Sequence, residues 1–214
     1  MTVKNRSARR TRDADATRAA LLSAATEVFA EVGYAGARVD EIAERARVNK
    51  RMIYEYFGDK HGLYRDVLTS RLALPAFSSH ETGDPREAVA ELIRWYFGLL
   101  AGDPAFARLL AWGMLAGSRS RKKHAPLLSS VAPVAELFSN VLRRGIAAGA
   151  FRSDIDVEMA RTTIFSLCLG YFIQHEVMIT AQRDEARRWT DDAFLENGIC
   201  RVLFDGIAAR EVSP

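Results

Sequence analysis

Apolar residues recur at helical spacing along nearly the whole chain. The first such segment covers residues 14–32, and its apolar positions fall on one face of a helix. That face carries Leu21, Ala25, Val28, Phe29 and Val32. No segment alternates apolar and polar residues with the β-branched enrichment of a half-buried strand. The pattern therefore predicts an all-α fold.

Three shorter helices are predicted after the first. Gly33 ends the first helix, and residues 39–46 and 50–57 form two short helices separated by a three-residue turn. Asn49 is placed to cap the second of these, because its side-chain oxygen can accept from the free N–H groups of a helix start. Asp59 is placed in the same way before the fourth helix.

Longer helices fill the rest of the sequence. We predict them at residues 84–101, 104–116, 126–148, 156–182 and 190–210, with turns at "AGDP" (101–104) and "GAFRSDID" (149–156). The charge run "SRSRKKH" at 118–124 is predicted to be an exposed loop. At 214 residues, the chain therefore fits a small module of short helices followed by a larger one.

The excess positive charge of the chain lies near its N-terminus. Residues 1–70 hold 13 Lys and Arg against 10 Asp and Glu, whereas residues 71–214 hold 17 of each. An arm at residues 1–13 contains Lys4, Arg6, Arg9, Arg10 and Arg12. A basic arm on a compact module is typical of a protein that binds a polyanion, although many solvated termini have the same composition.

The stretch "IAERARVNKRMIYEYFGDK" combines two short helices, a tight turn and a basic, aromatic face. On its second helix Ile53, Tyr56 and Phe57 cluster on one side, and Arg51 and Glu55 point the opposite way. The packed side would fix the angle of the helix, and the free side could then enter a DNA major groove. From spacing alone, the alternative is a helical hairpin with a solvated basic face.

Residues 33–68 resemble the DNA-binding domain of the tetracycline-repressor (TetR) family. The matching positions are Gly33-Tyr34, Val39, Ile42-Ala43, Val48-Asn49-Lys50, Ile53-Tyr54-Glu55-Tyr56-Phe57, and Lys60 with Leu63. The resemblance implies a three-helix helix-turn-helix domain at 14–70. It also implies a larger helical domain at 71–214 that binds an effector and dimerises.

The resemblance assigns roles to individual residues. The implied DNA-binding set is Arg38, Asn49, Lys50, Arg51, Met52, Tyr54, Tyr56 and Lys60. Within this set Lys50, Arg51, Met52 and Tyr54 would approach base edges. Tyr56 and Lys60 would hold phosphates, which carry no sequence information. For Tyr56 the alternative is core packing.

Three features of the sequence depart from the family pattern. Arg38 replaces the usual Ser or Thr cap of the second helix, and Arg47 replaces the usual Gly of the turn. A left-handed conformation at Arg47 would cost roughly 1–2 kcal/mol. Arg51 and Met52 replace the usual groove-facing Gly-Thr or Gly-Ala pair, so we expect an operator unlike those of the usual members.

The family implies a homodimer and a small-molecule effector, and the larger domain is compatible with both. Helix 156–182 is apolar around most of its circumference and must be covered on two sides, which an intersubunit four-helix bundle would provide. Candidate interface residues are Phe194, Leu203, Phe204 and Ile207. Candidates to line a site for an apolar or aromatic effector are Trp95, Tyr96, Phe106, Trp112, Phe165, Phe172 and His175; each could instead be plain core.

Other classes of protein lack support in the sequence. No run of 18 apolar residues and no apolar signal core occur, so we expect a cytoplasmic protein without a membrane partner. The histidines show no metal-ligand spacing, and we expect no metal or cofactor, with Cys168 and Cys200 as buried free thiols. Without a phosphate loop, HExxH motif or nucleophile elbow, we expect no enzyme.

The resulting hypothesis is a repressor that binds a palindromic operator as a dimer and is released by its effector. Two alternatives stay open at this point. One is an architectural DNA-binding protein without an effector. The less favoured one is a small helical enzyme or ligand carrier.

Overall fold

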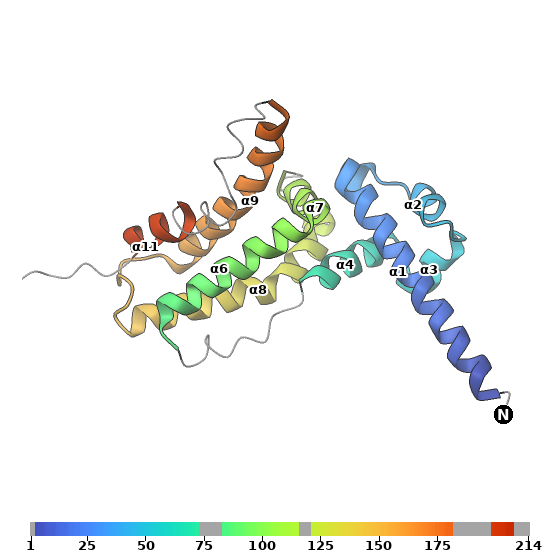
Figure 1. Cartoon of the computed structure of the whole chain (residues 1–214), viewed down its shortest axis with the longest axis horizontal. Helices are drawn as coiled ribbons and strands as arrows, with labels where there is room; N and C mark the ends of the chain where they lie inside the picture. Colours follow the sequence, from blue (N-terminus) through green and yellow to red (C-terminus); the bar gives the residue numbers. More distant parts are fainter. Residues whose placement is uncertain (1–2, 73–82, 116–120, 182–197, 208–214) are drawn as a thin grey trace, which may run out of the picture. The chain divides into compact units, whose positions relative to one another are not determined.

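The computed structural model describes residues 3–72, 83–115, 121–181 and 198–207, and helices make up most of these ranges (Figure 1). The chain forms two compact units. The first combines the residues up to 73 with Arg108–Ser130, and the second combines residues 74–107 with those from 131 onward. The predicted all-α architecture, an N-terminal helix-turn-helix followed by a larger helical part, is confirmed.

Four helices build most of the first unit. They are α1 (Val3–Gly36), α2 (Val39–Ala46), α3 (Arg51–Phe57) and α4 (Lys60–Arg71). Helix α1 packs against α2 and α4, and α3 packs against α4. Their inward side chains form a buried core that includes Leu21, Val28, Phe29, Ile42, Ile53, Leu63 and Leu68. This core holds the short helices α2 and α3 in fixed positions.

Helix α1 begins much earlier than the sequence pattern predicts. The predicted start lay at residue 14, but the helix begins at Val3 and runs through Asp13 and Asp15. Residues 3–13 contain no Gly or Pro, and Arg, Lys and Ala have high helix propensity. The basic arm is therefore a continuation of α1 from Val3 onward.

Gly33 interrupts α1 where the sequence predicts its end. Its φ of 68° and ψ of 174° are accessible to Gly at little cost, and the chain resumes helical geometry as far as Gly36. Trp112, from α7 (Pro104–Leu115), covers this break. Its indole N–H donates to the Ala30 carbonyl at 3.1 Å, and a Cβ on Gly33 would lie 3.3 Å from its ring. Gly33 thus permits both the break and the close approach of Trp112.

The second unit contains α6 (Pro85–Gly102), α9 (Val157–Ala181), α11 (Arg201–Ile207) and parts of α7 and α8 (Arg121–Ala147). Aspartates at the predicted breaks cap three helices. The backbone N–H groups of Arg86, Phe106 and Met159 donate to Asp84, Asp103 and Asp156 at 3.0, 3.0 and 2.8 Å. The predicted turns before α7 and α9 are therefore confirmed.

Helix α8 corrects one prediction. The charge run 118–124 was predicted to be a loop and the helix to begin at 126, but α8 begins at Arg121. Residues 121–124 are thus helical, and 118–120 lie outside the described residues. Arg121, Lys122 and Lys123 are good helix formers, and the helix extends through them.

Aromatic rings fill much of the core of the second unit. Tyr96 of α6 and Phe165 of α9 have ring centroids 4.9 Å apart, and Phe138 of α8 lies 4.9 Å from Phe165. Phe97 contacts Phe172 at 4.8 Å. Three helices therefore meet through aromatic contacts rather than through aliphatic side chains alone.

Candidate nucleic-acid interface

The turn between α2 and α3 is left-handed at Arg47, where the sequence resemblance leads one to expect Gly. Arg47 adopts φ 56° and ψ 38°, the left-handed conformation. Its N–H donates to the Glu44 carbonyl, and the Val48 N–H donates to the Ala43 carbonyl, both at 3.0 Å. These two bonds form a Schellman motif, which satisfies the last carbonyls of α2. This conformation destabilises the fold by roughly 1–2 kcal/mol for Arg, a cost that is absent for Gly.

The start of α3 is capped by Asn49, as predicted. The Asn49 Oδ1 accepts from the Arg51 backbone N–H at 2.8 Å, and the Asn49 carbonyl accepts from the Met52 N–H at 2.9 Å. The helix begins at Arg51, one residue later than predicted. Asn49 thereby contributes to the helix start, and any contact of its side chain with DNA stays a proposal.

Helix α3 has one packed face and one exposed face. Ile53 and Phe57 are buried, whereas Arg51 and Tyr54 are exposed. Tyr56 is half-buried and lies edge-on to Phe57 with ring centroids 6.2 Å apart. Met52 is also half-buried, and Glu55 is exposed. The predicted separation of a packed side, with Ile53 and Phe57, from a free side, with Arg51 and Glu55, is therefore confirmed, and Tyr56 lies at the boundary.

A polar cluster joins the start of α2 to the start of α3; we call Arg38, Asp40, Lys50 and Tyr54 the α2–α3 cluster. The Lys50 ammonium lies 2.7 Å from the Asp40 carboxylate. Their hydrogen bond lowers the pKa of Asp40 and raises the pKa of Lys50. The charge of Arg38 acts on both groups. Two of the predicted DNA-binding residues, Lys50 and Arg38, thus act on the Asp40 carboxylate, and Tyr54 acts on Lys50.

Lys60 is held by the first unit itself. Its Nζ donates to the Ala37 carbonyl at 2.6 Å and lies 4.6 Å from the centroid of the Tyr34 ring. The Asp59 side chain accepts from the Gly62 N–H at 2.7 Å and caps α4, as predicted. Lys60 therefore ties α4 to the segment between α1 and α2, a structural role that the sequence reading missed. Tyr34 was the available signal, because aromatic faces attract ammonium groups.

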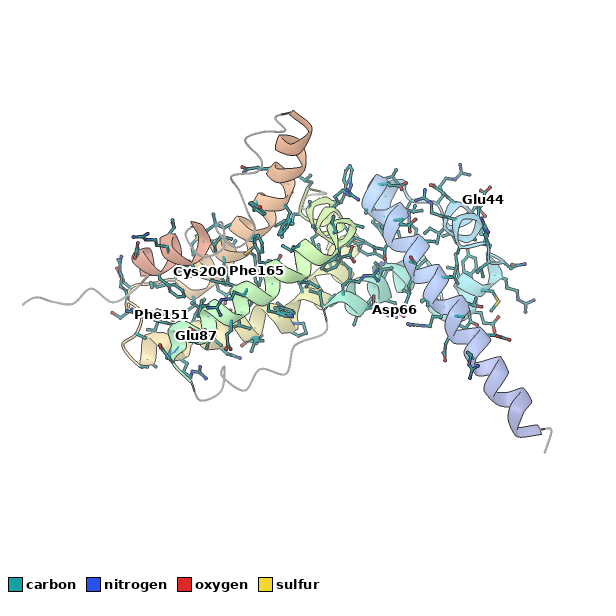
Figure 2. All side chains as sticks on the ribbon, viewed as in Figure 1. Glu44, Asp66, Glu87, Phe151, Phe165 and Cys200 are labelled. Carbon is teal, nitrogen blue, oxygen red and sulfur yellow. The ribbon has the colours of Figure 1, made fainter. Side chains whose placement is uncertain are left out.

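Two ion-pair groups hold the short helices on α1. Arg45 of α2 makes a bidentate contact with Glu31 at 2.6 and 2.9 Å, and this contact lowers the pKa of Glu31. Arg18 lies 2.6 Å from Asp66 of α4, which Figure 2 labels. The Arg18 guanidinium also lies 5.3 Å from the centroid of the Phe57 ring. Arg18 and Arg45 are partly exposed, so these ion pairs add little to stability and mainly fix how α2 and α4 are oriented on α1.

The structure separates the candidate effector residues into different surroundings. Tyr96 and Phe106 are buried, and Trp95, Phe165 and Phe172 are half-buried in the second unit. Burial raises the pKa of the Tyr96 hydroxyl, which stays neutral at physiological pH. Trp112 instead belongs to the first unit, where it packs on Gly33. The side chain of His175 lies outside the described residues.

The candidate interface residues are only partly described. Phe194 and the side chain of Ile207 lie outside the described residues. Leu203 is buried within its own chain, and Phe204 is half-buried. Large apolar side chains are exposed on α9 and α11. They are Met159, Leu167 and Ile173 on α9, and Val202 on α11.

Cysteine and metal chemistry do not define a site in the described ranges. Cys168 and Cys200 are buried free thiols, as predicted, and burial raises the pKa of Cys168 to about 12. His, Cys, Asp and Glu residues form no group of three or more suited to a metal ion within the part of the chain that is described. Over the same residues, no helix is both long and apolar enough to cross a membrane.

Two segments of the chain match sequence models of the same protein family. Residues 21–67 match the sequence model of "Bacterial regulatory proteins, tetR family". Residues 85–193 match that of "Tetracyclin repressor-like, C-terminal domain". The chain is 33% identical over 168 residues to the HTH-type transcriptional repressor NicS of Pseudomonas putida, which covers 76% of this chain and 78% of that protein.

More distant relatives share the same architecture. The fatty acid metabolism regulator protein of Bacillus subtilis is 27% identical over 195 residues, or 87% of this chain and 93% of that protein. The crystal structure of the transcriptional regulator FadR from Bacillus subtilis in complex with stearoyl-CoA superposes with a TM-score of 0.68 at 23% identity. It covers 88% of this chain and 98% of that structure. These matched proteins are transcriptional regulators and not enzymes.

Proposed function

Because this chain belongs to the tetR family of bacterial regulatory proteins, we propose that it represses transcription by binding a palindromic operator as a homodimer. We propose further that a small apolar or aromatic effector releases it from DNA. As a family member, the chain is a transcriptional regulator with a DNA-binding helix-turn-helix. The operator, the dimer and the effector are the parts of this account that require experiment.

The observation that carries the proposal is the exposed face of α3, which presents Arg51 and Tyr54. Arg51 and Tyr54 are exposed, while Ile53 and Phe57 on the opposite side are buried in the first unit. A short helix anchored on one side can enter the major groove as a rigid body. Arg51 could then donate two hydrogen bonds to a guanine, the commonest specific contact in protein–DNA complexes.

Residues around α3 support binding to the phosphate backbone. Arg38 has an extended backbone and directly precedes α2, and Tyr56 lies at the edge of the packed face of α3. The basic residues of the arm at 1–13 would add attraction that does not depend on sequence. Lys60 would have to contact phosphate while keeping or exchanging its bond to Ala37.

Exposed apolar side chains on α9 and α11 support a dimer. Met159, Ile173 and Val202 are 67%, 47% and 65% exposed in the single chain. Cover by a partner would remove these apolar side chains from water. In a two-fold dimer, two copies of α3 would face half-sites one turn of DNA apart.

The aromatic core of the second unit supports an apolar or aromatic effector. Tyr96, Phe138 and Phe165 come from three helices and touch one another. Apolar and aromatic side chains with few polar groups are typical of small-molecule sites. Since FadR of Bacillus subtilis was crystallised with stearoyl-CoA, a long-chain acyl-CoA belongs among the first compounds to test.

Selection of bound duplexes from a random-sequence DNA pool tests the proposal. Wild-type protein should enrich an inverted repeat, and a labelled duplex of that sequence should give a mobility shift. A compound that abolishes the shift supports effector-controlled repression. A shift that no compound affects would favour an architectural DNA-binding protein, and failure to enrich any sequence would contradict the proposal.

A further inference from the structure

We propose that Asp40 is a specificity-determining residue, which restrains Lys50 from contacting phosphates on non-operator DNA and orients it toward a base edge on the operator. The proposal rests on the operator binding proposed above. Asp40 itself is not among the residues expected to contact DNA. Its effect would pass through Lys50, so it is a positioning residue.

The contact between the two residues bridges the two helices of the DNA-binding motif. Asp40 lies in the first turn of α2, and Lys50 directly precedes α3. The Lys50 Nζ and the Asp40 Oδ1 are 2.7 Å apart, a full charge-assisted hydrogen bond. Both side chains are substantially exposed, at 44% for Lys50 and 62% for Asp40. The pair is therefore accessible to a nucleic acid.

Charge balance explains the expected effect on random DNA. The Asp40 carboxylate interacts with two cations, Arg38 and Lys50. The carboxylate neutralises Lys50 and repels any phosphate that approaches it. Non-specific binding depends on the number of phosphates that cations neutralise. Asp40 should therefore remove about one cation from the set available to random DNA.

On the operator the same contact should help rather than oppose binding. Lysine carries a long, flexible side chain, and holding it in one geometry before binding reduces the entropy lost on complex formation. The electrostatic repulsion from Asp40 is then offset by the orientation it gives to Lys50. Loss of Asp40 should thus strengthen binding to random DNA while leaving operator binding unchanged or weaker.

The contact has little importance for folding, which makes the proposal testable. Exposed ion pairs contribute little to stability. Glu41 follows Asp40 in the first turn of α2 and also favours the helix N-terminus, so Asp40→Asn leaves one acidic residue there. Glu44 provides a matched control, since it is an exposed acid one turn further along α2 (Figure 2).

The experiment compares full-length wild type, Asp40→Asn and Glu44→Gln by fluorescence anisotropy at several salt concentrations. The probes are the duplex selected by wild type and a scrambled duplex of the same length and composition. Asp40→Asn should tighten binding to the scrambled duplex by about two- to fivefold relative to Glu44→Gln. Its log–log salt dependence on that duplex should steepen by about 0.9, the slope of one additional phosphate contact.

A second comparison identifies the route of the effect. In a Lys50→Ala background, Asp40→Asn should change binding to the scrambled duplex no more than Glu44→Gln does. Equal effects of Asp40→Asn and Glu44→Gln in the wild-type background would overturn the proposal, as would a persistent Asp40→Asn effect without Lys50. If wild type selects no duplex at all, the operator-binding function fails first, and the two failures are therefore distinguishable.

Discussion

Arg51 and Lys60 both bring positive charge to the helix-turn-helix, but their surroundings differ. Arg51 is exposed, and its backbone N–H donates to the Asn49 side chain. We expect Arg51→Ala to relax discrimination at one position in each half-site by about 1–3 kcal/mol without loss of folding. Titrations on matched and singly mismatched operators measure this. Equal losses on both duplexes would remove Arg51 from the base-reading residues.

Lys60→Ala should behave differently, because the Lys60 ammonium binds the Ala37 carbonyl inside the unit. We expect weaker binding to operator and random DNA by the same factor, since a lost phosphate contact acts without regard to sequence. The free energy of unfolding should also fall, by on the order of 1 kcal/mol, and the melting temperature should fall with it. Thermal unfolding followed by circular dichroism checks this, and an unchanged melting temperature would contradict the structural role.

Gly62 is required at its position because the backbone approaches it closely. A Cβ on Gly62 would lie 1.9 Å from the Phe57 carbonyl oxygen, which cannot rotate away as a side chain could. We expect Gly62→Ala to destabilise the first unit by about 1–3 kcal/mol, the usual cost of overpacking. Chemical denaturation measures the change.

Gly98→Ala is the matched control for Gly62→Ala. Gly98 lies within α6, is exposed, and a Cβ there would meet no atom within 4 Å. Replacing it should stabilise its helix by about 0.5–1 kcal/mol, because Gly loses more backbone entropy than Ala. Destabilisation by both changes to the same extent would show that the contact with Phe57 is not the cause.

Local chemistry determined which residue roles could be predicted. The caps at Asn49 and Asp59 follow from residue types a few positions from a helix start, and the structure shows both. The pairing of Lys50 with Asp40 joins different helices, and sequence spacing gives no indication of it. The bond from Lys60 to Ala37 spans 23 residues and depends on how α1, α2 and α4 pack.

At the scale of elements, the turn between α2 and α3 is strained, because Arg47 occupies a position where Gly would adopt the same backbone conformation without strain. Arg47 is held in the left-handed conformation, with φ 56°. We expect Arg47→Gly to stabilise the first unit by about 1 kcal/mol, since Gly adopts this conformation without a Cβ penalty. Arg47→Ala removes the same side chain but keeps the Cβ, so it should give no gain. Equal denaturation midpoints for the two variants would contradict the strain.

The extent of each helix was predicted less well than its existence. Gly33 was identified as a break because Gly favours positive φ, and the break is present. The starts of α1 and α8 were predicted too late, at residues 14 and 126, whereas the helices begin at Val3 and Arg121. Basic segments without Gly can extend a helix beyond its apolar part, and residue type alone does not show where the extension stops.

At the scale of the whole molecule, α7 contributes to both compact units. Its residues up to Ala107 belong to the second unit, and those from Arg108 belong to the first, where Trp112 packs on Gly33. Because α7 has residues in both units and α4 packs against α3, a change in either helix on effector binding could alter the position of α3. The order of predicted helices indicated two modules, but the assignment of Arg108–Ser130 to the first unit depends on tertiary packing that periodicity does not encode.

Control by an effector should be reciprocal. A compound can release DNA only by as much as it prefers the state that cannot bind DNA. We expect a coupling of about 1–3 kcal/mol, with operator DNA weakening compound binding by the same factor that the compound weakens operator binding. Tryptophan fluorescence titrations with long-chain acyl-CoAs and aromatic compounds, with and without operator, measure both factors. A bound compound with the same affinity in both titrations is not an inducer.

The spacing of the two half-sites tests the central claim, that two copies of α3 read a palindromic operator as a rigid dimer. Five base pairs inserted between the half-sites of the selected inverted repeat turn them to opposite faces of the duplex, about half a helical turn apart. Anisotropy titrations of wild type on the original and expanded duplexes measure the effect. The account predicts a loss of affinity toward the level of scrambled DNA, about 10³-fold for a typical regulator. Unchanged affinity for the expanded duplex would contradict it.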